Sequence, residues 1–112
     1  MAWLMLFVAG VFEVAWAVSM KSTEGWTRLR PSLITLGLMA VSFYLLSRAM
    51  LQIPIGTAYA VWTGIGSVGV AILGIAIYKE PVTAARLLFI AMIVAGIVGL
   101  KVVSDLPARP AV

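Results

Sequence analysis

The sequence contains no cysteine and no histidine. These absences exclude disulfides and thiolate metal centres, and they remove the commonest general base and the commonest metal ligand. The acidic residues are only Glu13, Glu24, Glu80 and Asp105, so we expect no carboxylate metal site. We also expect no cofactor. We expect no enzymatic activity, because no serine–histidine or cysteine–histidine pair is available for nucleophilic chemistry.

Charge is also scarce. Of the 112 residues only 11% are charged and 63% are hydrophobic, and the mean hydropathy is +1.14, whereas soluble domains have about 25% charged residues. A soluble fold of this size could not bury so much apolar surface. The eight basic residues are scattered between apolar runs and form no stripe with interleaved aromatics. This pattern indicates an integral membrane protein with no nucleic-acid partner.

Four apolar runs predict four membrane-spanning helices, at residues 2–20, 32–50, 55–78 and 84–103. Each run is about as long as the ~20 residues that cross a bilayer. Polar, glycine or proline residues interrupt the chain between them, as at residues 21–25, at Pro54 and at residues 79–81. We therefore expect an all-α membrane protein with one four-helix domain over residues 1–104 and a short flexible tail at 105–112.

Glu13 lies near the middle of the first apolar run. An ionisable group at that depth costs on the order of 3 kcal/mol and is usually present for function. Gly10 and Trp16 stand three residues before and after it, so all three share one helix face. Because burial favours the protonated form, Glu13 would bind a proton or a cation but not both well. With alternating access, that competition is enough to couple cation export to proton entry.

The second and third runs supply further candidates for a cation pocket. Indole rings offer cation–π faces, and hydroxyls can orient a carboxylate by hydrogen bonding. The expected pocket residues are Glu13, Trp16, Ser42, Tyr59 and Trp62, with Gly10, Met39 and Phe43 as weaker candidates. Alternative roles remain open, since membrane aromatics often serve as interfacial anchors and membrane serines often bond to their own backbone.

Small residues mark two of the helices. Gly64 and Gly66 are the expected bend in the third helix, because clustered glycines weaken a membrane helix locally. Ala91, Ala95 and Gly99 recur every four residues in the fourth helix, which is a pattern that favours close helix contact.

The basic residues are divided between the two ends of the expected helices. One end carries Arg48, Lys101 and Arg109, and the other carries Lys21, Arg28, Arg30, Lys79 and Arg86. This bias is small under the positive-inside rule, so the chain could insert in both orientations. Two oppositely inserted copies would supply the inverted symmetry that many transporters use.

Three stretches together resemble the small multidrug resistance family of transporters. They are GVFEVAW at residues 10–16, SFY at 42–44 and PIGTAYAVWTGIG at 54–66. The resemblance implies an antiparallel, dual-topology homodimer in a bacterial inner membrane that exports a cation in exchange for protons. It also implies a site shared by both copies of Glu13 and a hinge at Gly64 and Gly66. The implied dimer contacts lie in the fourth helix, at Ala91, Ala95, Gly96 and Gly99.

Trp16 and the stretch KEP at residues 79–81 resemble the guanidinium-exporting subgroup of that family. The subgroup that exports quaternary ammonium and polyaromatic cations typically has a small residue where Trp16 stands. Guanidinium is planar and pairs with carboxylates in bidentate fashion, which suits Glu13 with polar neighbours. We therefore expect export of guanidinium and small substituted guanidinium ions. The alternatives are an exporter of lipophilic cations with the same fold and a non-transporting accessory subunit.

Overall fold

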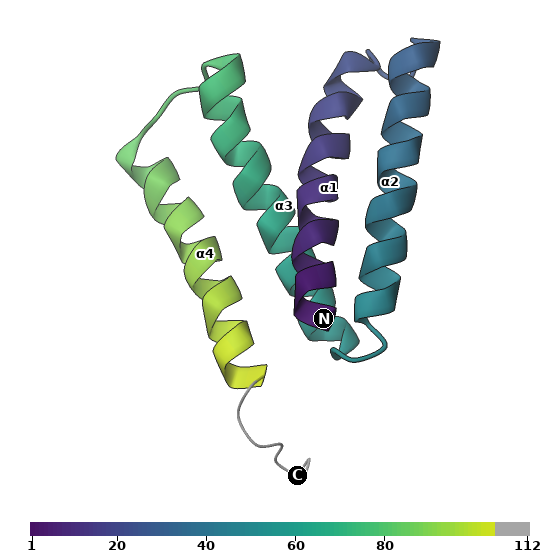
Figure 1. Ribbon diagram of the computed structural model, residues 1–112. Helices are drawn as coiled ribbons and strands as arrows, with labels where there is room; N and C mark the ends of the chain where they lie inside the picture. The colour runs from purple at the N-terminus through teal and green to yellow at the C-terminus, as the bar shows by residue number, and fades with distance from the viewer. Residues whose placement is uncertain (105–112) are drawn as a thin grey trace.

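The computed structural model describes residues 1–104, which form four α-helices (Figure 1). The helices are α1 (Ala2–Ser22), α2 (Leu29–Ala49), α3 (Ile55–Tyr78) and α4 (Ala84–Ser104). Each is long and apolar enough to cross a membrane. The expected all-α fold with four candidate spans is therefore confirmed. The expected tail at 105–112, with Asp105 and Arg109, lies outside the described residues.

Successive helices run in opposite directions, so the chain alternates between two ends of the molecule (Figure 1). The N-terminus and the end of α4 lie at one end, and the α1–α2 and α3–α4 turns lie at the other. Lys21 and Arg86 are consequently placed at the same end although they belong to different hairpins.

The α1–α2 turn differs from the expected boundaries. Helix α2 begins at Leu29, three residues earlier than expected, and Pro31 lies inside its first turn. The first N–H groups of a helix have no partner within the helix, so proline is tolerated there. Helix α1 continues to Ser22, after which the buried Thr23 hydroxyl donates to the Met20 carbonyl at 2.7 Å and accepts from the Trp26 N–H at 3.0 Å.

The α3–α4 turn ends and begins its helices with residues suited to those positions. Lys79 adopts a left-handed conformation (φ 55°) directly after α3. Thr83 caps α4, because its hydroxyl accepts a hydrogen bond from the Arg86 N–H at 3.1 Å.

Helix α1 packs against both α2 and α3, whereas α4 packs mainly against α3 (Figure 1). Lys101 of α4 also contacts α1, with its Nζ atom 4.9 Å from the centre of the Trp3 ring. The buried hydrophobic residues come from the first three helices and the α2–α3 turn; they are Ala2, Leu6, Ala9, Leu46, Ala49, Ile53, Ala58, Val61 and Trp62. Helix α4 contributes no buried residue. The core of the described chain is thus the α1–α2–α3 contact.

Glycines set how closely the helices approach α3. A Cβ on Gly10 of α1 would lie 2.5 Å from Cγ2 of Ile65, and a Cβ on Gly69 would overlap the Val14 side chain. On the other side of α3, a Cβ on Gly64 would lie 2.9 Å from Cδ1 of Ile97 in α4. Such contacts are the close backbone approach that small residues allow between membrane helices.

Candidate functional site

Glu13 of α1 faces Gly66 of α3. A Cβ on Gly66 would overlap the Glu13 carboxyl group, so the carboxylate occupies the space that this glycine leaves open. The Glu13 side chain is half-buried, and its Oε1 atom is buried without a hydrogen-bond partner among the described residues. Buried polar atoms are usually satisfied. An unpaired carboxyl oxygen is therefore available to accept a hydrogen bond from a bound cation or to carry a proton.

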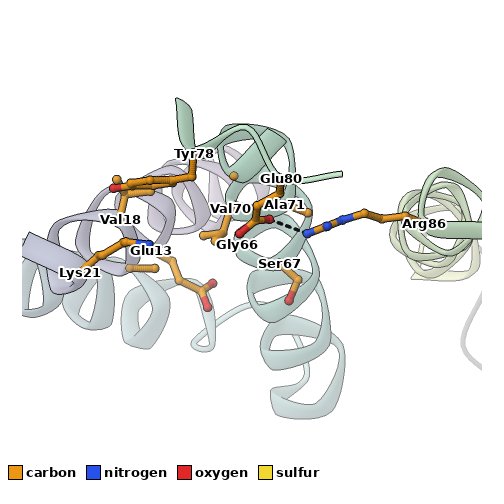
Figure 2. Close-up of a pocket in the computed structure, with 12 residues that line it drawn as sticks. Glu13, Val18, Lys21, Gly66, Ser67, Val70, Ala71, Tyr78, Glu80 and Arg86 are labelled. Carbon is orange, nitrogen blue, oxygen red and sulfur yellow. Dashed lines mark hydrogen bonds and ion pairs between the residues drawn. The ribbon is translucent and has the colours of Figure 1, made fainter. Parts of the chain in front are cut away.

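A cavity of about 540 Å³ extends from Glu13 toward the end of the molecule that holds the α3–α4 turn (Figure 2). Its polar lining residues are Glu13, Lys21, Ser67, Tyr78, Glu80 and Arg86. The apolar wall consists of small or medium residues of α1 and α3, among them Ala17, Val70 and Ala71. The carboxylate is therefore reachable from one end of the helix bundle along a partly polar path.

Four predicted aromatic residues form a continuous ring cluster beside Glu13's helix. The Trp16 and Phe43 centroids are 6.1 Å apart in an edge arrangement, and those of Phe43 and Trp62 are 5.7 Å apart. Tyr59 extends the cluster, with its ring 5.5 Å from that of Trp62. The structure thus brings together one residue of α1, one of α2 and two of α3 that the sequence had grouped.

Ser42 is fully buried and joins all three of these helices. Its hydroxyl donates to the Ala9 carbonyl at 2.8 Å and accepts from the Trp62 Nε1–H at 3.0 Å. The single hydroxyl proton is therefore used on the backbone of α1, one turn before Glu13. In this structure Ser42 positions the helix that carries the carboxylate, instead of donating to the carboxylate as expected.

Of the residues expected to form the pocket, Glu13 alone lines this cavity of the described chain. Tyr59 is 56% exposed, and its ring packs against that of Trp62. Met39 is half-buried on α2, and the Ile65 side chain occupies the space beside Gly10. The Trp16 Nε1 atom, like Glu13 Oε1, is buried without a hydrogen-bond partner in the part of the chain described.

Helix α3 is continuous through Gly64 and Gly66 in this structure. Gly64 makes room for Ile97 and Gly66 makes room for Glu13, so both glycines have a packing role here. Their role as a hinge stays a prediction. The expected dimer-contact residues Ala91, Ala95, Gly96 and Gly99 are exposed along α4, and the last two line a second cavity of about 500 Å³ between α3 and α4.

Sequence reasoning missed the charged groups at the far end of the Glu13 cavity. Glu80 is half-buried and accepts an ion-paired hydrogen bond from Arg86 at 2.5 Å. Lys21 lies 4.3 Å above the centre of the Tyr78 ring. These contacts join residues of α1, α3, the α3–α4 turn and α4. Only the proximity of Glu80 and Arg86 across Pro81 was visible in the sequence.

The Ser42 hydroxyl offers a direct test of how the site is positioned. We expect Ser42→Ala to leave the Ala9 carbonyl and the Trp62 indole N–H less well satisfied, and to destabilise the folded protein by about 1–2 kcal/mol. Thermal unfolding in detergent measures this effect. Ser47→Ala is the matched control, because the exposed Ser47 hydroxyl bonds only to the Tyr44 carbonyl of its own helix. Equal stability of the two variants would contradict the interpretation.

Four apolar spans, with one half-buried carboxylate held between α1 and α3, define a multi-pass integral membrane protein. The Small Multidrug Resistance protein family profile matches residues 1–93. The chain is 57% identical over 104 residues to a guanidinium exporter of Proteus vulgaris, which covers 93% of this chain and 100% of the relative. It is 56% identical over 101 residues to a guanidinium exporter of Citrobacter freundii, covering 90% of this chain and 96% of the relative.

A third similar protein, a guanidinium exporter of Yersinia pseudotuberculosis, is 55% identical over 104 residues, covering 93% of this chain and 100% of the relative. The chain belongs to the small multidrug resistance family, as its three motifs predicted. It is a multi-pass transport protein of the bacterial inner membrane.

Proposed function

We propose that this protein exports guanidinium and small substituted guanidinium ions in exchange for protons. The observation that carries the proposal is the Glu13 carboxyl group, whose Oε1 is buried without a partner among residues 1–104 and lies beside a cavity that opens toward one end of the bundle. Relatives 55–57% identical to the chain are guanidinium exporters, which supports this choice of substrate.

The chemistry of the cation fits the surroundings of Glu13. Guanidinium presents N–H donors in a plane, and a carboxylate can accept two of them in parallel. Trp16 is one turn after Glu13 on α1, and its ring packs in one cluster with those of Phe43 and Trp62. We propose that this cluster offers an aromatic face to a flat cation held by Glu13. A quaternary ammonium ion has no N–H to donate and needs a wider apolar space than a closed ring cluster leaves.

Coupling follows from having one intramembrane carboxylate. Glu13 is the only acidic residue within the four helices, so proton and cation compete for the same group. Access would then alternate between the two membrane faces, with Gly64 and Gly66 as the points where α3 changes shape. If the site changes its access only while Glu13 holds a proton or a cation, the protein exchanges one for the other and neither leaks across the membrane alone.

The proposed partner is a second copy of this chain in the opposite orientation. Helix α4 has no buried residue and exposes the small residues Ala91, Ala95, Gly96 and Gly99, which favour helix–helix contact in a membrane. The two copies would place both Glu13 side chains at one shared site. A tag-accessibility assay that found every C-terminus on one side of the membrane would refute the dual topology.

The direct test is transport by the purified protein in proteoliposomes under an imposed proton gradient. We expect uptake of guanidinium and methylguanidinium against their concentration gradients, and no uptake of tetraphenylphosphonium. Transport of tetraphenylphosphonium without guanidinium transport would instead indicate an exporter of lipophilic cations. No transport of any cation would indicate an accessory subunit.

Trp16 should set the upper limit on substrate size. We expect Trp16→Gly to admit bulky cations that the wild type excludes, and to slow guanidinium transport up to about tenfold through loss of the ring contact with Phe43. The same transport assay with both substrates measures the change. Trp26→Gly is the control, because Trp26 lies in the α1–α2 turn at φ 69°, which glycine adopts readily. An unchanged substrate range in Trp16→Gly would contradict the assignment.

A further inference from the structure

A second carboxylate, Glu80, stands at the mouth of the cavity that contains Glu13. Glu80 follows α3 and its Oε1 accepts a hydrogen bond from Arg86 Nη2 of α4 at 2.5 Å (Figure 2). The other terminal nitrogen of Arg86 donates to the Pro81 carbonyl at 3.3 Å. The Arg86 guanidinium group therefore donates to both a carboxylate and a backbone carbonyl at this end of the cavity.

Glu80 faces the cavity because Gly74 makes room for it. A Cβ on Gly74 would lie 2.5 Å from Glu80 Oε1, so the carboxylate rests directly on the backbone of α3. Gly74 is eight residues after Gly66, the glycine on which Glu13 rests, and this spacing separates them by about 12 Å along the helix. Two carboxylates thus lie over two glycines of one helix face, one deep and one at the mouth.

The charges along the cavity show which carboxylate an incoming cation meets first. The two cationic side chains in the lining are Lys21 and Arg86. Lys21 stands over the Tyr78 ring, whereas Arg86 pairs with Glu80. Within residues 1–104, no protein cation lies within salt-bridge distance of Glu13. A cation that enters from this end reaches the Glu80–Arg86 pair before it reaches Glu13.

We propose that Glu80 is a second, transient binding site for the guanidinium substrate, and that Arg86 occupies it when the substrate is absent. The inference rests on the proposed function, since it takes guanidinium as the substrate. Free guanidinium and the Arg86 head group carry the same charge and the same kind of planar N–H donors, so one can replace the other on the same carboxylate.

The ion pair is placed so that this exchange can occur. The side chains of Arg86 and Glu80 are 35% and 42% exposed, and ion pairs accessible to water contribute little to stability. Displacement of Arg86 would also release the bridge between α4 and the end of α3. Arg86 is therefore a positioning residue, and substrate arrival at Glu80 loosens the α3–α4 turn at the moment when the cation must pass.

Side-chain NMR of the full-length protein in lipid bicelles, labelled with ¹⁵N-arginine, tests the proposal. The Glu13→Gln variant removes the deep site, and Arg86→Lys identifies the Arg86 guanidinium resonance by its loss. On titration with guanidinium chloride we expect the Arg86 resonance of Glu13→Gln to shift in a saturable manner. We expect no such shift in the Glu13→Gln, Glu80→Gln double variant, nor with tetramethylammonium chloride, which controls for ionic strength.

Each outcome decides the proposal. No Arg86 shift at guanidinium concentrations that saturate the wild type would overturn it, and so would the same shift in the double variant. The other arginine resonances report whether each variant is folded. In transport, Glu80→Gln should raise the KM for guanidinium several-fold, and an unchanged KM would also overturn the proposal. Failure of the proposed function is distinguishable, because the wild type would then transport no guanidinium.

Discussion

Proteoliposomes that contain Glu13→Gln are expected to show no proton-driven uptake of guanidinium. The amide keeps the size of the side chain but cannot carry the charge or exchange a proton. Truncating one partner of a buried charge pair costs about 2–5 kcal/mol, so guanidinium affinity should fall by roughly thirtyfold or more. Isotope uptake and calorimetric binding measure the two effects separately.

Glu24→Gln is the matched control for this loss. Glu24 lies in the exposed α1–α2 turn and its Oε2 atom is 3.9 Å from Arg28 Nε, which makes it a water-accessible carboxylate away from the cavity. The transport rate of the Glu24→Gln variant should equal that of the wild type. Retention of proton-coupled transport by Glu13→Gln would remove the basis of the proposed mechanism.

Gly66→Ala is expected to damage the site almost as severely through packing alone. The added Cβ overlaps the Glu13 carboxyl group, so α1 and α3 must separate or Glu13 must leave its position. Overpacking of this kind costs about 1–3 kcal/mol. We expect a lower thermal midpoint in detergent together with a large loss of guanidinium transport.

Gly37→Ala separates this effect from the general effect of replacing a helix glycine. Gly37 is in the interior of α2, and a Cβ there meets no atom within 4 Å in the described structure. That variant should be as stable as the wild type or slightly more stable, since alanine is the better helix former. If Gly66→Ala retained both wild-type stability and wild-type transport, that result would contradict the close contact between Gly66 and Glu13.

The four spans and the central carboxylate could be predicted because their physical signals are local. Runs of apolar residues interrupted by Pro54 or by residues 79–81 are sufficient to place helices. Glu13 is conspicuous because a charge is expensive in any membrane helix, whatever its neighbours. The three-residue spacing of Tyr59 and Trp62 likewise requires only helical geometry, and the structure places their rings in contact.

The partners of Ser42 and Glu80 could not be predicted because they depend on how the helices pack. Helical spacing puts Ser42 on a face but does not say whether its proton goes to Glu13 or to the Ala9 carbonyl. In the sequence, Glu80 looks like a solvated turn residue, because it stands between Lys79 and Pro81. Only the fold shows that it rests on Gly74 and pairs with Arg86 at the cavity. The hinge and the dimer depend on further states and copies of the chain, so they remain proposals.

The contact between Glu13 and Gly66 has a consequence for biogenesis. Helices α1 and α2 are synthesised first, but the glycine that accommodates the carboxylate belongs to α3. Until α3 emerges from the ribosome, the first hairpin presents an unshielded carboxyl group, which disfavours its release into lipid. Membrane integration of this short chain should therefore be completed late, when α3 reaches α1, rather than one helix at a time.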